Sequence, residues 1–224
     1  MTVKLNNIEM YYEKTGSGSP LLLLHGNGED HSIFDKLAEK LSQDFTVYAV
    51  DSRNHGQSEK TADYRYETMA EDLKAFIETL NLGKADIIGF SDGAIVSLLL
   101  AMKHDELINK MALLGINLSP EDFTEENYRY IKDMYEETKD PLWEMMLTQP
   151  QISLDEVRTV QIPSLVIAAE DDLFRPDTFT KLTEALPNAE LRIIKGHDHG
   201  SYVINQDILY PELLGFFRSP NGKN

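Results

Sequence analysis

The sequence contains one serine in a G-x-S-x-G pattern, in the segment Gly89-Phe90-Ser91-Asp92-Gly93. The apolar run Ile87–Phe90 predicts a buried strand before the serine, and Ala94–Met102 predicts a helix after it. A chain that passes from strand to helix this quickly turns sharply, and glycines on either side of Ser91 let the two elements approach closely. The turn lifts the hydroxyl to a helix N-terminus, where backbone N–H groups stabilise negative charge. The pattern therefore predicts a nucleophilic serine.

A serine hydroxyl is a poor nucleophile until a base accepts its proton, and histidine is the usual base. Two histidines, His197 and His199, follow the apolar run Leu191–Ile194, which predicts a strand. Both are candidates for the base of Ser91.

The base in turn needs a carboxylate that orients its imidazole ring. Three adjacent carboxylates, Glu170, Asp171 and Asp172, follow the predicted strand Leu165–Ala169. The chain between them and the histidines has room for one helix and one strand, so acid and base would leave neighbouring strands. Because the carboxyl ends of parallel strands lie at one edge of a sheet, we expect acid and base on the same rim.

Strands and helices alternate along most of the chain, which predicts an α/β fold with a mostly parallel, eight-stranded sheet and helices on both faces. A hairpin over Val3–Leu5 and Ile8–Tyr12 is expected first, with Asn6-Asn7 at its turn. Further strands are expected at Leu21–Leu24, Thr46–Val50, Ile87–Phe90, Met111–Leu114, Leu165–Ala169 and Leu191–Ile194, and helices at Phe34–Leu41, Met69–Leu80, Ala94–Met102, Phe179–Leu186 and Ile208–Phe217.

The segment 117–151 interrupts this alternation. It is rich in Glu, Tyr and Met, contains the only tryptophan, Trp143, and predicts two or three short helices without a strand between them. We interpret it as a small helical cap inserted into a single domain spanning 1–224; the alternative is an enlarged connecting helix.

Composition narrows the classes of partner. The 224 residues carry a formal net charge of −17, which repels phosphate backbones and anionic lipid, so neither nucleic acid nor a membrane is expected as a partner. The chain has no cysteine, which excludes thiol nucleophiles and thiolate metal sites. The start, Met1–Glu9, lacks the basic and apolar runs of a signal peptide, and we expect a cytoplasmic protein. We expect a small-molecule substrate, no cofactor and no metal; the oligomeric state is not indicated.

The chain resembles the α/β-hydrolase fold family over nearly its whole length, with the candidate nucleophile, acid and histidine in the family's order. Four further segments carry the resemblance: His25-Gly26-Asn27-Gly28, Asp51-Ser52-Arg53-Asn54-His55-Gly56-Gln57-Ser58, Ala169-Glu170-Asp171-Asp172 with Pro176, and Gly196-His197-Asp198-His199. Asn54 and Ala169 each replace a glycine that is usual in the family.

The resemblance implies a catalytic triad of Ser91, Asp172 and His199. Its register favours Asp172 over Asp171 or Glu170 as the acid, and His199 over His197 as the base. It also implies an oxyanion hole formed by the backbone N–H groups of Asn27 and Asp92.

The implied activity is hydrolysis of a small carboxylic ester or lactone through an acyl-enzyme. The alternatives are a thioesterase or a carbon–carbon bond hydrolase on the same triad, and a non-catalytic binding protein of this fold. Candidate substrate-binding residues are His25, Asp92 and Trp143. His25 also fits a purely structural role in its loop, and Asp92 either starts the helix or attracts a cationic group such as an ammonium.

Overall fold

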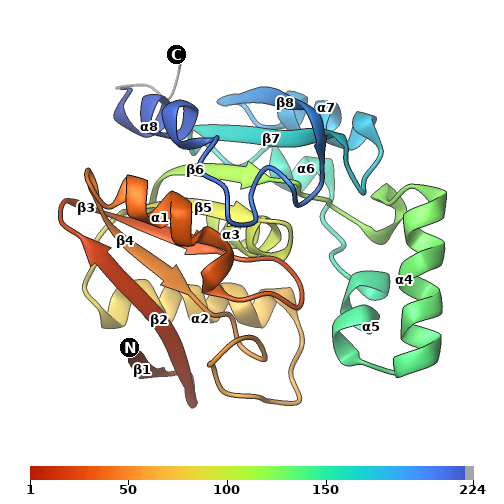
Figure 1. Ribbon diagram of the computed structural model, residues 1–224, viewed down its shortest axis with the longest axis horizontal. Helices are drawn as coiled ribbons and strands as arrows, with labels where there is room; N and C mark the ends of the chain where they lie inside the picture. The colour runs from red at the N-terminus through yellow and green to blue at the C-terminus, as the bar shows by residue number, and fades with distance from the viewer. Residues whose placement is uncertain (220–224) are drawn as a thin grey trace.

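The computed structural model describes residues 1–219 and consists of one eight-stranded sheet with helices on both faces (Figure 1). The strand order is β1-β2-β4-β3-β5-β6-β7-β8. The strands are β1 Thr2–Leu5, β2 Ile8–Gly16, β3 Ser19–Leu24, β4 Phe45–Val50, β5 Ala85–Phe90, β6 Ile108–Leu114, β7 Ser164–Asp171 and β8 Ala189–Asp198. Strand β2 pairs antiparallel with β1 and β4, and all other pairs are parallel. The predicted α/β fold is confirmed.

Helices cover both faces of the sheet. They are α1 Asp35–Leu41, α2 Tyr66–Thr79, α3 Asp92–Lys103, α4 Glu125–Thr138, α5 Pro141–Thr148, α6 Leu154–Val157, α7 Pro176–Ala185 and α8 Tyr210–Arg218. Side chains alternate along a strand, so Leu21 and Leu23 of β3 pack with α1 and α8, while Leu22 and Leu24 pack with α2 and α3 on the other face. This double burial explains the uninterrupted apolar run of β3.

Local chemistry accounts for the ends of several elements. The hairpin between β1 and β2 turns through Asn6 and Asn7, which have φ angles of 44° and 62°. Asparagine tolerates this left-handed backbone better than most residues. Strand β8 runs on to Asp198, beyond the predicted Leu191–Ile194, and Asp198 pairs with Asp171 at the end of β7. The ends of β7 and β8 therefore lie side by side.

Between β6 and β7 the chain forms a short 3-10 turn, Pro120–Asp122, followed by α4 and α5, which pack against each other beside the sheet (Figure 1). A single antiparallel bridge joins Phe123 to Phe174 in the loop after β7. Gln149 at the end of α5 accepts a hydrogen bond from the Tyr66 N–H at the start of α2. These contacts fix both ends of the helical segment to the sheet domain. Within residues 1–219, no helix is both long enough and apolar enough to cross a membrane.

Candidate active site

Ser91 lies at the sharp turn between β5 and α3. Its backbone has φ 52° and ψ −115°, a conformation that few non-glycine residues adopt, and its N–H donates to the Leu114 carbonyl at 2.8 Å. A Cβ on Gly89 would lie 2.3 Å from the Gly93 oxygen, and one on Gly93 would lie 2.2 Å from the Leu24 oxygen. Both glycines are therefore required by the close approach of strand and helix, as the sequence predicts.

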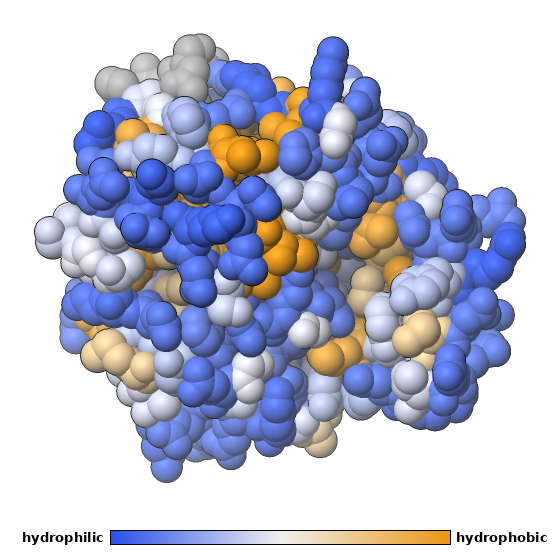
Figure 2. All heavy atoms as spheres, viewed as in Figure 1, coloured by the Kyte–Doolittle hydropathy of each residue, from blue (hydrophilic) through white to orange (hydrophobic). Residues whose placement is uncertain are grey.

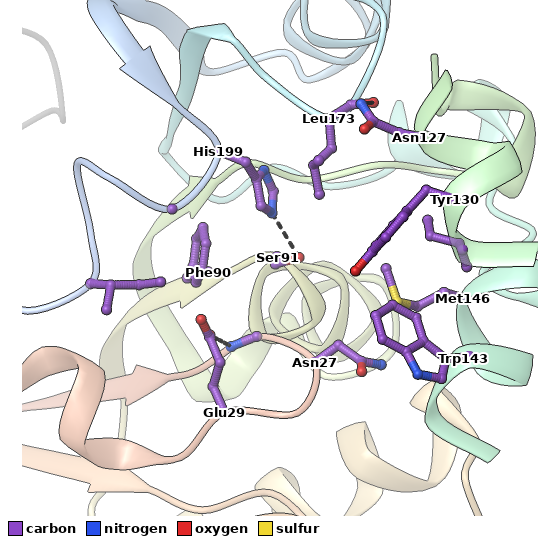
Figure 3. Close-up of a pocket in the computed structure, with 14 residues that line it drawn as sticks. Asn27, Glu29, Phe90, Ser91, Asn127, Tyr130, Trp143, Met146, Leu173 and His199 are labelled. Atoms are coloured by element: carbon purple, nitrogen blue, oxygen red, sulfur yellow. Dashed lines mark hydrogen bonds between the residues drawn. The ribbon is translucent and has the colours of Figure 1, made fainter. Parts of the chain in front are cut away.

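His199 bridges Ser91 and Asp172. Its Nε2 lies 3.1 Å from the Ser91 Oγ (Figure 3). Its Nδ1 lies 2.7 Å from Asp172 Oδ1. The Asp172 side chain is only 2% exposed, and it also accepts backbone N–H groups of Leu173 at 2.8 Å and Ala169 at 3.0 Å. These contacts hold the carboxylate where it can orient the imidazole and stabilise its cation.

The other candidates of the two loops are engaged elsewhere. His197 Nδ1 lies 3.1 Å from the Ser201 hydroxyl, and Glu170 accepts the Gly196 N–H at 2.9 Å. Asp171 is exposed at the end of β7. Among the three candidate acids Glu170, Asp171 and Asp172, Asp172 is the one hydrogen-bonded to His199.

Gly115, directly after β6, provides the space for the histidine and was not identified from the sequence. Its φ is 57°, and a Cβ there would lie 2.7 Å from the His199 Cε1. The ring also packs between Phe90 and Phe174, at centroid distances of 5.0 and 5.4 Å. The only sequence signal was a glycine at the carboxyl end of a strand, and such glycines are too common to indicate a packing role by themselves.

The loop after β3 brings Asn27 to the start of α3. The Asn27 side chain donates to Asp92 Oδ2 at 3.1 Å and to the Leu142 carbonyl at 3.2 Å, which ties this loop to α3 and α5. Within residues 1–219, neither the Asn27 nor the Asp92 backbone N–H donates to another protein group. Both amides belong to segments that flank Ser91, where an oxyanion hole requires donors.

Two predicted substrate-binding side chains are occupied by protein contacts. The Asp92 carboxylate is buried and accepts the Tyr66 hydroxyl at 2.7 Å in addition to Asn27, so it is not free to meet a substrate cation. His25 contacts the Gly26 carbonyl through Nδ1 and accepts the Ser52 N–H through Nε2, and burial lowers its pKa to about 4. These contacts favour a bracing role for Asp92 and His25 in the loops around the site.

A cavity of about 230 Å³ opens above Ser91, between the sheet and helices α4 and α5. Figure 2 shows the hollow on this face, with apolar side chains gathered in it. The described residues that line it are mostly apolar and include no lysine or arginine: Gly26, Asn27, Glu29, Phe90, Ser91, Asn127, Tyr130, Ile131, Trp143, Met146, Leu173, His199, Gly200 and Ile204. Trp143, a candidate substrate-binding residue, lines the cavity and meets Tyr130 edge to face at 6.1 Å between ring centroids.

Glu29 is a lining residue that the sequence analysis missed. Its Oε2 accepts the Gly26 N–H at 2.9 Å. Burial, the largest effect, raises its pKa to about 7, while the Gly26 hydrogen bond and nearby His199 act in the opposite direction. The only sequence signal was an acid three residues after a loop glycine, and such acids are common in turns.

One group of three potential metal ligands occurs among the described residues: Asp30, His31 and Asp51. Protein donors already occupy its carboxylates, because Asp51 accepts from His31 and Asp30 accepts from Ser32. We assign no metal to this group.

Comparison with known proteins agrees with this architecture. The family model described as alpha/beta hydrolase fold matches residues 19–140. Ethanol acetyltransferase 1 of Kluyveromyces lactis is 30% identical over 213 residues, covering 91% of this chain and 47% of that protein. The AB hydrolase superfamily protein YisY of Bacillus subtilis is 34% identical over 112 residues, 49% of this chain and 42% of its own length. The chain thus spans less than half the length of these curated relatives.

Solved structures show the same fold at lower identity. Est816, an N-acyl homoserine lactone degrading enzyme, superposes with a TM-score of 0.82 at 22% identity, covering 96% of this chain and all of that one. A thermophilic esterase from Thermogutta terrifontis gives 0.78 at 20% identity, covering 97% of this chain and 96% of that one. Since the family model matches more than half of the chain, the chain belongs to the α/β-hydrolase fold family.

Proposed function

We propose that this protein is a serine hydrolase that cleaves a small carboxylic ester or lactone through an acyl-enzyme. The observation that carries the proposal is the continuous hydrogen-bonded chain from Ser91 through His199 to Asp172, placed at the floor of a largely apolar cavity. A nucleophile, a base and an orienting acid within hydrogen-bond distance of one another are the parts that acyl transfer requires.

The proposed reaction uses each group in turn. His199 accepts the Ser91 proton as the Oγ attacks the substrate carbonyl, and the Asn27 and Asp92 amides stabilise the oxyanion. His199 then gives the proton to the leaving alcohol, which leaves an acyl-enzyme. A water molecule that loses its proton to His199 attacks this ester, and collapse of the second oxyanion releases the acid and restores Ser91.

The segment 117–151 acts in this proposal as a cap that shapes the substrate site. Helix α4 supplies Asn127, Tyr130 and Ile131 to the cavity wall, and α5 supplies Trp143 and Met146, whereas the proposed triad lies on loops of the sheet domain. The cap would therefore govern which acyl or alcohol groups fit, and the triad would govern the chemistry.

Labelling with a fluorophosphonate probe tests the nucleophile. We expect Ser91 to be the labelled residue by mass spectrometry, Ser91→Ala to abolish labelling, and turnover to fall at least about a thousandfold. Ser97→Ala is the matched control, because Ser97 lies six residues after Ser91 in α3 and donates to the Gly93 carbonyl instead of facing the cavity. Labelling that persists in Ser91→Ala contradicts the proposal.

A substrate panel distinguishes the reactions that one triad supports. It combines para-nitrophenyl esters of graded acyl length with lactones, thioesters and diketones, and each ester is also assayed with added ethanol. The ethanol arm reports acyl transfer to an alcohol, the activity that the name of the K. lactis relative denotes. We expect esters or lactones to give the highest kcat/KM; a higher value for thioesters or diketones would replace the proposed bond class.

A further inference from the structure

Glu29 is the single carboxylate among the residues that line the cavity in the described part of the chain. In Figure 3 its carboxylate is directed toward the Phe90 and Ser91 side of the cavity. A Cβ on Gly26 would lie 2.8 Å from Glu29 Oε2 and 3.0 Å from the Ser91 Cβ, so carboxylate and nucleophile flank the same glycine.

The two oxygens of this carboxylate are used differently. Oε2 is held by the Gly26 N–H, which fixes the side chain against the loop after β3. Among residues 1–219, no protein group donates a hydrogen bond to Oε1. Glu29 therefore presents one acceptor oxygen without a protein partner beside the cavity.

Among residues 1–219, no lysine or arginine lines the cavity, so no positive side chain of the described chain balances this carboxylate there. The titratable groups that act on Glu29 are His199, Asp92 and Asp30. Asp92 and Asp30 repel its negative charge, and only a protonated His199 attracts it. An unbalanced carboxylate in a mostly apolar site gains more from a bound cation than an exposed one does.

The opposite wall suits the same type of ligand. Tyr130 and Trp143 lie across the cavity from Glu29, and aromatic faces attract organic cations (Figure 3). Asp92, the other acid near the nucleophile, is occupied by Tyr66 and Asn27 and offers no comparable acceptor.

We propose that Glu29 is a specificity-determining residue that favours substrates bearing an organic cation, such as an alkylammonium group, and disfavours those bearing a carboxylate. The inference rests on the proposed function, since it names the class of ester that the same site accepts.

The test compares aryl esters whose acyl chain ends in a trimethylammonium, an isosteric tert-butyl or a carboxylate group, on wild type and Glu29→Gln. Glutamine keeps an acceptor for the Gly26 N–H while removing the charge. The ratio between variants cancels differences in intrinsic ester reactivity. We expect the preference for the cationic over the neutral ester to fall about tenfold in Glu29→Gln, and discrimination against the anionic ester to weaken similarly. Asp30→Asn is the charge control, because that carboxylate caps Ser32 outside the cavity, and it should leave both ratios unchanged.

The pH dependence of the cationic-to-neutral ratio gives a second readout. Both esters need the same neutral His199, so its protonation cancels in the ratio, and the trimethylammonium charge does not titrate. Because burial raises the Glu29 pKa to about 7, we expect the ratio to rise with pH through this region in wild type and to stay flat in Glu29→Gln.

A binding measurement separates this inference from the proposed function. Calorimetric titration with 3-phenylpropylammonium and with 3-phenylpropanol needs no catalysis. If wild type binds the ammonium more tightly than the alcohol and Glu29→Gln loses this preference, the inference is supported even when no ester is hydrolysed. A failure to hydrolyse any ester would instead refute the proposed activity. A cation preference absent from wild type, or retained in Glu29→Gln, overturns the role of Glu29.

Discussion

Asp172 accepts three hydrogen bonds, from the Ala169 and Leu173 N–H groups and from the His199 Nδ1. All three donors approach from fixed positions, so both oxygens must remain acceptors. The site thus discriminates against an amide at this position even though an amide has almost the same shape. This distinction makes the role of the acid testable without disturbing the fold.

Asp172→Asn should lower kcat/KM at least about a thousandfold, because its NH₂ group must face either a backbone N–H or the imidazole. Asp171→Asn is the matched control, since Asp171 is exposed and the same change there should cost less than about threefold. Kinetics on both variants, with circular dichroism to verify folding, checks this. Equal losses from the two changes would remove Asp172 from the proposed triad.

His199→Ala should be as damaging as Ser91→Ala, because groups that act as one unit lose their effect together. His197→Ala should cost less than about tenfold, since its ring contacts Ser201 in the loop after β8. Ester kinetics of the three variants decide the ranking. A larger loss of turnover in His197→Ala than in His199→Ala would move the assignment of the base from His199 to His197.

The sequence predicted the residues that motifs define and missed those that tertiary contacts define. Ser91, Asp172 and His199 each come directly after a strand, and strands followed by such motifs can be recognised locally. The engagement of Asp92 could not be predicted, because its partner Tyr66 is far away in sequence. Glu29 was missed for the related reason that only the folded chain shows which acids enter the cavity.

At the scale of elements, the crossing of β3, β5 and α3 positions the proposed nucleophile, and its tightness depends on glycine. Gly93→Ala places a methyl group 2.2 Å from the Leu24 carbonyl oxygen, a backbone atom that cannot move alone. We expect the free energy of unfolding to fall by at least about 2 kcal/mol in chemical denaturation. Gly83→Ala separates the clash from backbone strain: its Cβ meets nothing within 4 Å, but its φ of 70° should cost about 1 kcal/mol. An equal loss in both variants contradicts the close-approach argument.

The central strands β3 to β7 were predicted to within a few residues because burial on both faces makes them apolar runs, as in Leu21–Leu24. Strand β8 was predicted too short. Its C-terminal half is an exposed edge whose residues Lys195–Asp198 carry no apolar pattern, yet it pairs with the end of β7. The number of helices in 117–151 was predicted, but the surfaces against which they pack were not, because amphipathic spacing does not reveal which surface a helix faces.

Trp143→Ala tests the cap at the level of one side chain. Trp143 lines the cavity from α5, so its loss should raise KM several-fold for long or aromatic acyl esters and less for an acetate. Tyr128→Ala is the control, because this half-exposed aromatic on α4 is not a lining residue. Equal changes for acetate and long esters in Trp143→Ala would indicate a general disturbance instead of altered selectivity.

At the scale of the whole molecule, the formal net charge of −17 is spread over many exposed acids and a few buried ones. The two kinds contribute oppositely to stability. Asp30, which is only partly buried, is stabilised as an anion by Ser32, which lowers its pKa, whereas burial raises the pKa of Asp86 to about 6 and that of Glu29 to about 7. An acid of the second kind binds its proton more tightly in the folded chain than in the unfolded one, so it favours folding at low pH and loses that contribution as the pH rises.

Comparing the pH dependence of stability of wild type with that of Glu29→Gln therefore reports the pKa of the Glu29 carboxylate in the folded chain. The folded pKa is raised from 4.5 to about 7, so its contribution is complete below the unfolded value and disappears as the pH rises through 7. Between about pH 5.5 and pH 8.5, the free energy of unfolding of wild type should fall by about 2 kcal/mol relative to Glu29→Gln. Urea denaturation at each pH measures the difference. Asp30→Asn is the control: the lowered pKa of Asp30 places its titration below this range, so its difference from wild type should stay flat. A flat difference for Glu29→Gln as well would mean that Glu29 keeps an ordinary pKa and is already ionised throughout this range, so its cavity is better solvated than its burial indicates.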